Sequence, residues 1–189
     1  MVYSYQFWDE QGPYIIDPFA RELVNITSVD LRLGRCLLLQ RYEGQPFNDE
    51  PALLQDDGRL LLEDGRVLSG IFQPGDSVLA HTLETLNVPN TIRLQGMLKS
   101  SVARAGLNHR TALYIDPGFQ GQLTLELLFD REGILVPGKR IIQVEAQQVD
   151  YDVPPSRSYD GHYQGSEGVV PNQNPDIAFV PYLAVGNKA

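Results

Sequence analysis

Two short stretches of this sequence combine hydroxyl, basic and acidic side chains at spacings that suit chemistry on a small anion. In the first, KSSVARAGL, Ser100 and Ser101 precede a brief run of helix-forming residues, and Gly106 follows it. Because serine favours helix amino ends and glycine favours the position after a helix, we expect a helix of one or two turns. Its free backbone N–H groups beside Lys99 could bind an anion, although a simple capped helix fits the same pattern.

The second stretch is the strand-like segment QLTLELLF, in which apolar and polar residues alternate. In an extended strand the apolar side chains share one face, and the other face carries Gln122, Thr124 and Glu126. Two interpretations of Glu126 follow. It lies either on a solvated outer face or in a pocket, where partial desolvation would raise the pKa of the carboxyl group and suit it to acid–base catalysis.

The net charge of the chain limits the kinds of ligand that it is expected to bind. The 189 residues include 15 Lys plus Arg and 24 Asp plus Glu, which gives a net charge of −9 at neutral pH. Nucleic-acid polymers are bound mainly through clustered basic side chains, so we expect no such partner. A small phosphorylated ligand remains compatible, because Lys99, Arg104 and Arg110 form the densest basic stretch. Asp116 follows them at a Pro-Gly turn and is either a turn cap or a functional carboxylate.

Several protein classes are excluded by what the sequence lacks. Cys36 is the single cysteine and the three histidines are far apart, so neither an intrachain disulfide nor a Cys-rich zinc site is expected. The H-x-E…P-C-x-x-C signature of zinc deaminases is absent. No apolar run approaches the ~20 residues of a membrane span, and the first residues lack a signal-peptide pattern. We therefore expect a cytoplasmic protein without a membrane partner.

Short strands between turns dominate the remaining sequence. Residues 29–33 alternate apolar and polar side chains, and Asp64-Gly65 separates two apolar runs as in a tight hairpin. Further strands are expected over residues 77–89, 122–129 and 140–149, with Pro-Gly pairs at the turns. The pattern predicts a mainly β fold, a distorted β-barrel or jelly roll, with one or two short helices.

Three segments are expected along the chain, and a shift in composition from about Val153 marks the last of them. We expect an N-terminal extension over residues 1–16, a β domain over 17–153 and a C-terminal arm or tail over 154–189. The third segment is rich in Pro, Gly, Ser and Asn at its start, which is typical of a linker. Its Tyr159, His162 and Tyr163 leave open a flap that closes over a ligand.

The run LKSSVARAGL, followed by TALYIDPGFQGQLTLEL, resembles the core motifs of the dCTP deaminase family, within the dUTPase-like superfamily. Flanking segments agree in order from residue 17 to 168: NITSVDLRLG, QPGDSVLAHTLETLNVP, VPGKRIIQV and SYDGHYQGSEG. The resemblance implies a homotrimer of β-clip subunits, with active sites at the subunit interfaces that a C-terminal arm closes. It further implies deamination of dCTP to dUTP without zinc, with Mg²⁺ arriving on the triphosphate.

The resemblance also implies roles for individual residues. Glu126 matches the catalytic carboxylate of the family, which would accept a proton from water as the water attacks C4 of cytosine. Ser100 and Arg104 match the residues that position this water and polarise the base. Lys99 and Ser101 match phosphate contacts at the amino end of the helix.

Four further positions match nucleotide contacts in the family. Ala112 matches the small residue beside the cytosine, Asp116 the residue that holds the sugar hydroxyl, and Tyr159 and His162 the arm positions that touch the nucleotide. The chain departs from the usual pattern in having Lys99 in place of Arg and His162 in place of Lys. Both changes bear on how the triphosphate is held.

Three functions remain open on these residues. The first is a zinc-independent dCTP deaminase, with or without further cleavage of dUTP to dUMP and pyrophosphate. The second is a nucleotide pyrophosphatase of the dUTPase or dCTPase kind, in which Asp116 activates water and no deamination occurs. The third is a catalytically silent, nucleotide-sensing trimer. Glu126, Arg104 and Ser100 favour the first.

Overall fold

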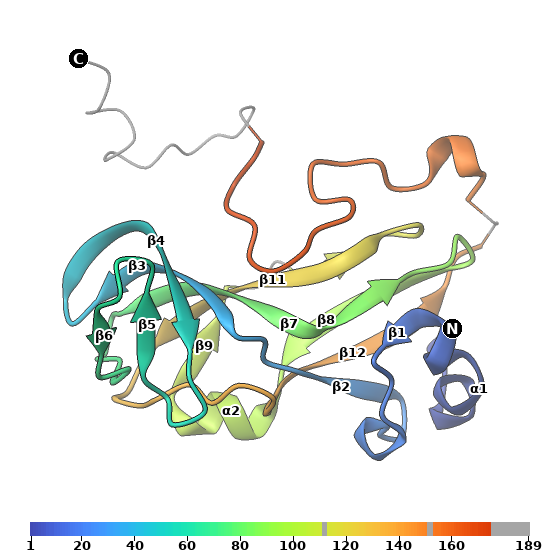
Figure 1. Ribbon diagram of the computed structural model, residues 1–189. Helices are drawn as coiled ribbons and strands as arrows, with labels where there is room; N and C mark the ends of the chain where they lie inside the picture. The colour runs from blue at the N-terminus through green and yellow to red at the C-terminus, as the bar shows by residue number, and fades with distance from the viewer. Residues whose placement is uncertain (111–112, 151–152, 175–189) are drawn as a thin grey trace.

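The computed structural model describes residues 1–110, 113–150 and 153–174, which form two antiparallel sheets (Figure 1). The larger, eight-stranded sheet has the order β6-β5-β4-β3-β7-β11-β9, with β1 paired to β7. Its strands are β1 (Ile16–Asp17), β3 (Cys36–Tyr42), β4 (Gln45–Leu54), β5 (Leu60–Leu62), β6 (Val67–Leu68), β7 (Ser77–Asn87), β9 (Leu107–His109) and β11 (Gln120–Phe129).

The smaller sheet contains four strands in the order β10-β8-β12-β2. They are β2 (Ser28–Arg32), β8 (Ile92–Leu98), β10 (Tyr114–Ile115) and β12 (Arg140–Gln148). Two α-helices, α1 (Tyr5–Ile15) and α2 (Ser100–Ala105), and two 3₁₀ turns, Arg21–Leu23 and Pro155–Arg157, complete the described residues. The expected mainly β fold with short helices is confirmed. The expected barrel is not closed over the described residues, because both sheets end in unpaired edge strands.

Strand β11 is the element that most directly positions the site. It pairs with the long strand β7, and its side chains alternate as the sequence predicts: Leu123, Leu125, Leu127 and Phe129 are buried in the core. This alternation fixes Glu126 on the opposite face, across from Leu79 of β7. The hairpin expected at Asp64-Gly65 is also present, between β5 and β6.

Helix α2 lies where the sequence predicts, but its cap differs from the expectation. Lys99, not a serine, is the N-cap residue, and no side chain caps the helix. Ser100 is the first helical residue, so its hydroxyl is free for other contacts. The helix ends at Gly106, whose φ of 101° lies in the left-handed region that glycine tolerates best.

The N-terminal segment packs into the body of the protein. Trp8 of α1 is fully buried, and its indole Nε1 donates to the carbonyl oxygen of Thr27 at 3.4 Å. The backbone N–H of Tyr3 donates to the carbonyl of Ala146 in β12. Residues 1–16, predicted to be an N-terminal extension, therefore contribute to the core. None of the described helices is long and apolar enough to cross a membrane.

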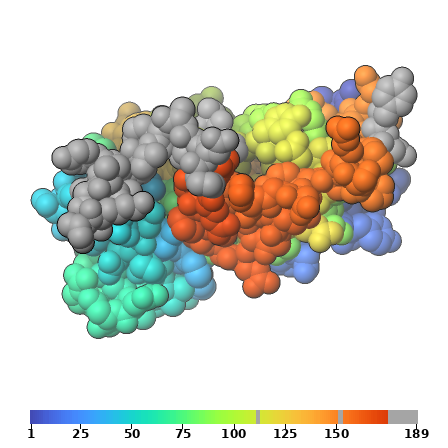
Figure 2. All heavy atoms as spheres, turned by 90° about the horizontal axis from the view of Figure 1, so that it is seen from above, coloured from blue at the N-terminus to red at the C-terminus, as the bar shows by residue number. Residues whose placement is uncertain are grey.

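The described part of the C-terminal segment is an arm that runs along β11 (Figures 1 and 2). The backbone N–H of Gly165 donates to the carbonyl of Gln120, and that of Gln122 donates to the carbonyl of Ser166, each at 2.8 Å. Further on, the N–H of Val170 donates to the hydroxyl of Thr124. These bonds hold the arm against the same face of β11 that carries Glu126.

Replacing Trp8 by alanine tests the contribution of α1 to stability. We expect Trp8→Ala to lower the free energy of unfolding by about 3–5 kcal/mol, because it removes a large buried side chain and leaves a cavity. Tyr14→Ala in the same helix is the matched control, since Tyr14 is 74% exposed. Chemical denaturation of both variants measures the difference, and equal small losses would show that α1 is not part of the core.

Candidate active site

An open cavity of about 510 Å³ lies between the outer face of β11, the turn that precedes it and the C-terminal arm. Its lining includes residues that the sequence singles out, namely Glu126, Asp116, Tyr159 and Arg110. Arm residues lie across this face in the space-filling view (Figure 2). The cavity is thus closed on one side by the chain's own arm.

Glu126 lines this cavity instead of standing on a fully solvated face. Its side chain is 29% exposed, and its Oε2 has no hydrogen-bond partner among the described residues. Burial raises the pKa of the Glu126 carboxyl group, while the charge of Arg110 acts in the opposite direction. A carboxylate with a raised pKa holds an abstracted proton more readily than an exposed one, as a general base requires.

His109 is the neighbour of Glu126 that the sequence does not reveal. Its Nε2 lies 3.4 Å from Oε2 of Glu126, and its side chain is only 3% exposed. Desolvation lowers the pKa of His109 to about 4, so the imidazole is neutral at neutral pH. The two residues meet because β9 pairs with β11 and places His109 beside Leu127. Glu126 therefore has a neutral, buried imidazole as a close neighbour.

The turn and the arm meet at the mouth of the cavity. The carbonyl of Asp116 accepts from the N–H of Phe119, which closes the turn, and the Asp116 side chain lines the cavity. The N–H of Tyr159 donates to the carbonyl of Pro117, and the Tyr159 ring packs edge-on against Phe119 with ring centroids 5.7 Å apart. Asp116 and Tyr159 are therefore held together.

Two arm residues differ in their relation to this cavity. Tyr163, one of the three residues of the expected flap, lines it, whereas the exposed His162 does not line it. Ala112, which the resemblance places beside the base, lies outside the described residues.

The α2 residues are not part of this cavity. Ser100, Ser101 and Arg104 are exposed, and none of them lines the cavity that holds Glu126. Within one chain, the predicted site residues thus fall into two separate sets. One set contains the carboxylates near β11, and the other contains the hydroxyl-bearing and basic residues of α2.

Lys99 is engaged by a buried carboxylate. Its Nζ lies 2.7 Å from both oxygens of Asp30, which is fully buried. Arg140 and Asn25 also donate to Asp30, at 3.3 and 2.9 Å. A buried charge is tolerated only when it is paired and hydrogen-bonded, so this cluster fixes the position of Lys99, the N-cap residue of α2.

Among the described residues, no three His, Cys, Asp or Glu side chains are grouped to hold a metal ion.

The chain resembles known proteins over most of its length. The dCTP deaminase-like family matches residues 7–149. The chain belongs to this family. Two relatives bear the name dCTP deaminase, dUMP-forming: that of Aquifex aeolicus is 36% identical, with 87% of this chain and 88% of the relative covered, and that of Thermobifida fusca is 38% identical, with 87% of each covered.

The fold agrees with this membership of the dCTP deaminase-like family. The crystal structure of 2'-deoxycytidine 5'-triphosphate deaminase from Agrobacterium tumefaciens superposes with a TM-score of 0.57 at 19% identity. The superposition covers 78% of this chain and 48% of that protein, so the chain spans about half of its length. At this identity the likeness concerns the fold alone.

Replacing Lys99 by methionine tests the buried cluster. We expect Lys99→Met to lower the free energy of unfolding by about 3 kcal/mol, because Asp30 then keeps its charge without its closest cation. Lys139→Met is the matched control, since the Lys139 side chain is exposed and makes no ion pair among the described residues. Urea denaturation compares the two, and a loss below about 0.5 kcal/mol for Lys99→Met would contradict the assigned role.

Proposed function

We propose that this chain is a dCTP deaminase that releases dUMP, pyrophosphate and ammonia from dCTP and two water molecules. The observation that carries the proposal is the position of Glu126, half-buried in a cavity with Asp116 and Tyr159 and with its pKa raised by burial. The relatives named dCTP deaminase, dUMP-forming support the nature of the product.

In the first step, water adds to C4 of cytosine and ammonia leaves, which gives dUTP. Glu126 takes one proton from the attacking water and passes it to N3. It then takes the proton of the new hydroxyl group on C4 and passes it to the departing nitrogen, so it is ionised again at the end of the step. The charge of nearby Arg110 favours the ionised form of Glu126, because it opposes the rise in pKa. Ser100 and Arg104 hold the water and polarise the base.

In the second step, water attacks the α-phosphorus of dUTP and pyrophosphate leaves. Asp116 is the second carboxylate of the same cavity that the sequence singles out, and we assign to it the proton of this second water. The triphosphate brings Mg²⁺, which binds phosphate oxygens with few protein ligands and offsets their charge.

The proposed sites are shared between subunits of a homotrimer. Among the described residues, the cavity of one chain holds Glu126 and Asp116 but only Arg110 as a cation in its lining, which does not balance a tetraanionic triphosphate. Helix α2 of a second copy would supply the missing Ser100, Ser101 and Arg104, which are exposed and lie outside the cavity of their own chain. Lys99, fixed by Asp30, then orients this helix.

A product assay tests the proposed reaction. With dCTP and Mg²⁺ the protein should form ammonia, dUMP and pyrophosphate in equal amounts. Pyrophosphate and dCMP without ammonia would indicate the pyrophosphatase alternative, and dCTP binding without turnover would indicate the silent sensor. Either outcome would overturn the proposal.

Glu126→Gln should lower the rate of ammonia release about 10²–10⁴-fold while dCTP binding persists, because the amide cannot accept the proton. Glu10→Gln is the matched control, since Glu10 is exposed on α1. Rapid ammonia release by Glu126→Gln would show that another group is the base.

The pH profile tests the coupling between Arg110 and Glu126. Because the charge of Arg110 lowers the pKa of Glu126, Arg110→Gln should raise that pKa further. The base must be ionised, so the acid limb of kcat/KM should move to higher pH in Arg110→Gln, whatever happens to its maximum. Arg41→Gln, an exposed arginine on β3, is the control. An acid limb that stays in place or moves to lower pH would contradict the coupling.

A further inference from the structure

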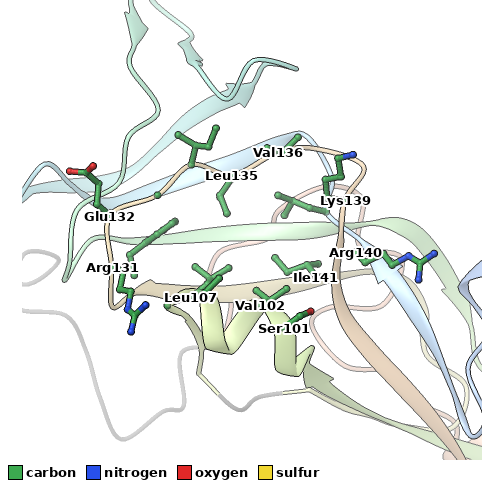
Figure 3. A pocket seen from close by; sticks show the side chains of 16 residues that line it. Ser101, Val102, Leu107, Arg131, Glu132, Leu135, Val136, Lys139, Arg140 and Ile141 are labelled. Atoms are coloured by element: carbon green, nitrogen blue, oxygen red, sulfur yellow. The ribbon is translucent and has the colours of Figure 1, made fainter.

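A second cavity, of about 340 Å³, lies between α2 and the connection that leads from β11 to β12 (Figure 3). Val102, Leu107 and Ile141 point into it from one side and Leu135 from the other (Figure 3). The interior is therefore apolar, and its volume lies within the range of small-molecule sites, roughly 300–1,000 Å³. None of its lining residues is shared with the cavity that holds Glu126.

The rim of this second cavity is positively charged. Lys139, Arg140 and the hydroxyl-bearing Ser101 lie at one end, and Arg131 lies at the other (Figure 3). Arg131 and Lys139 are exposed, and their side chains have no ion-pair partner among the described residues. In a chain of net charge −9, such a cluster at an apolar opening is a local exception.

The acidic side chain of the lining does not neutralise this rim. Glu132 accepts a hydrogen bond from Nε2 of Gln73 at 3.1 Å and is directed away from the cavity (Figure 3). The charge of Arg140 is partly neutralised by Asp30, since Nη1 of Arg140 lies 3.3 Å from Oδ2 of Asp30. Lys139 therefore provides the free charge at the end where Ser101 lies.

We propose that the second cavity binds an apolar monoanion, a short acyl chain with a terminal carboxylate. The acyl chain would lie between Val102 and Leu135, where apolar contacts replace water. The carboxylate would accept a hydrogen bond from the ammonium group of Lys139. Because Val102 belongs to α2, a bound acyl chain would also contact the helix that carries Ser100 and Arg104.

Octanoate is a direct probe, and isothermal titration calorimetry on the intact protein measures its binding without turnover. We expect one octanoate per chain, bound at least tenfold more tightly than octylammonium or 1-octanol. Affinity should rise about fourfold per CH₂ group from butanoate to octanoate, because each group buries apolar surface. Equal affinity for the anion, the alcohol and the cation would overturn the proposal.

Two variants locate the probe. Ala105→Trp should abolish binding, because Ala105 lines the cavity from an exposed position and the indole would fill it. Lys139→Glu should weaken octanoate binding at least tenfold, whereas Arg41→Glu, with the same change in net charge, should leave it unchanged. Thermal unfolding checks that each variant is folded.

Three further results would contradict the proposal. They are octanoate binding unaffected by Ala105→Trp, an equal loss in Lys139→Glu and Arg41→Glu, and stoichiometric displacement of octanoate by dCTP with Mg²⁺. The last would show that this cavity is part of the nucleotide site and not a separate one.

Discussion

The proposed chemistry depends above all on the partial desolvation of one carboxylate, that of Glu126. A carboxyl group on an open strand would be hydrated and ordinarily acidic, whereas burial raises its pKa. Three elements supply this burial: β7 provides the neighbouring surface, β9 brings the neutral His109 within 3.4 Å, and the arm lies along the same face. The opposing charge of Arg110 keeps the group available as a base.

The second constraint is how an acidic chain holds a highly charged nucleotide. Its cations are not gathered in the cavity of Glu126 and Asp116. Lys99 is committed to the buried Asp30, and Arg104 stands exposed on α2. In the proposed account, the two incomplete halves become one site when copies of the chain associate, so assembly itself concentrates positive charge where the triphosphate binds.

Local patterns in the sequence predict a large part of this structure. The alternation in QLTLELLF is enough to place Glu126 opposite the core face of β11, and Gly106 marks the end of α2 because its left-handed conformation suits glycine. What the sequence does not reveal depends on contacts between distant residues. The pair of Lys99 and Asp30 joins positions 69 residues apart. His109 meets Glu126 only through the register of β9 with β11.

Other features that the sequence does not reveal also depend on contacts between distant residues. Trp8 stands in the segment predicted to be an N-terminal extension, and nothing in the local sequence shows that it fills the core. Tyr163 and His162 are adjacent in sequence, yet only Tyr163 lines the cavity, because the path of the arm decides which side chain points inwards. The positive rim around Lys139 likewise forms only when the connection after β11 folds over α2.

Mixing two inactive variants tests the shared site most directly. Arg104→Ala and Glu126→Gln subunits, unfolded together in equal amounts and reassembled, are each expected to be inactive alone. If every site takes Glu126 from one subunit and Arg104 from the next, about one site in four is intact, and about a quarter of the wild-type ammonia release should return. Activity that stays at the level of the separate variants would contradict the account, because it would place both residues in the same chain's site.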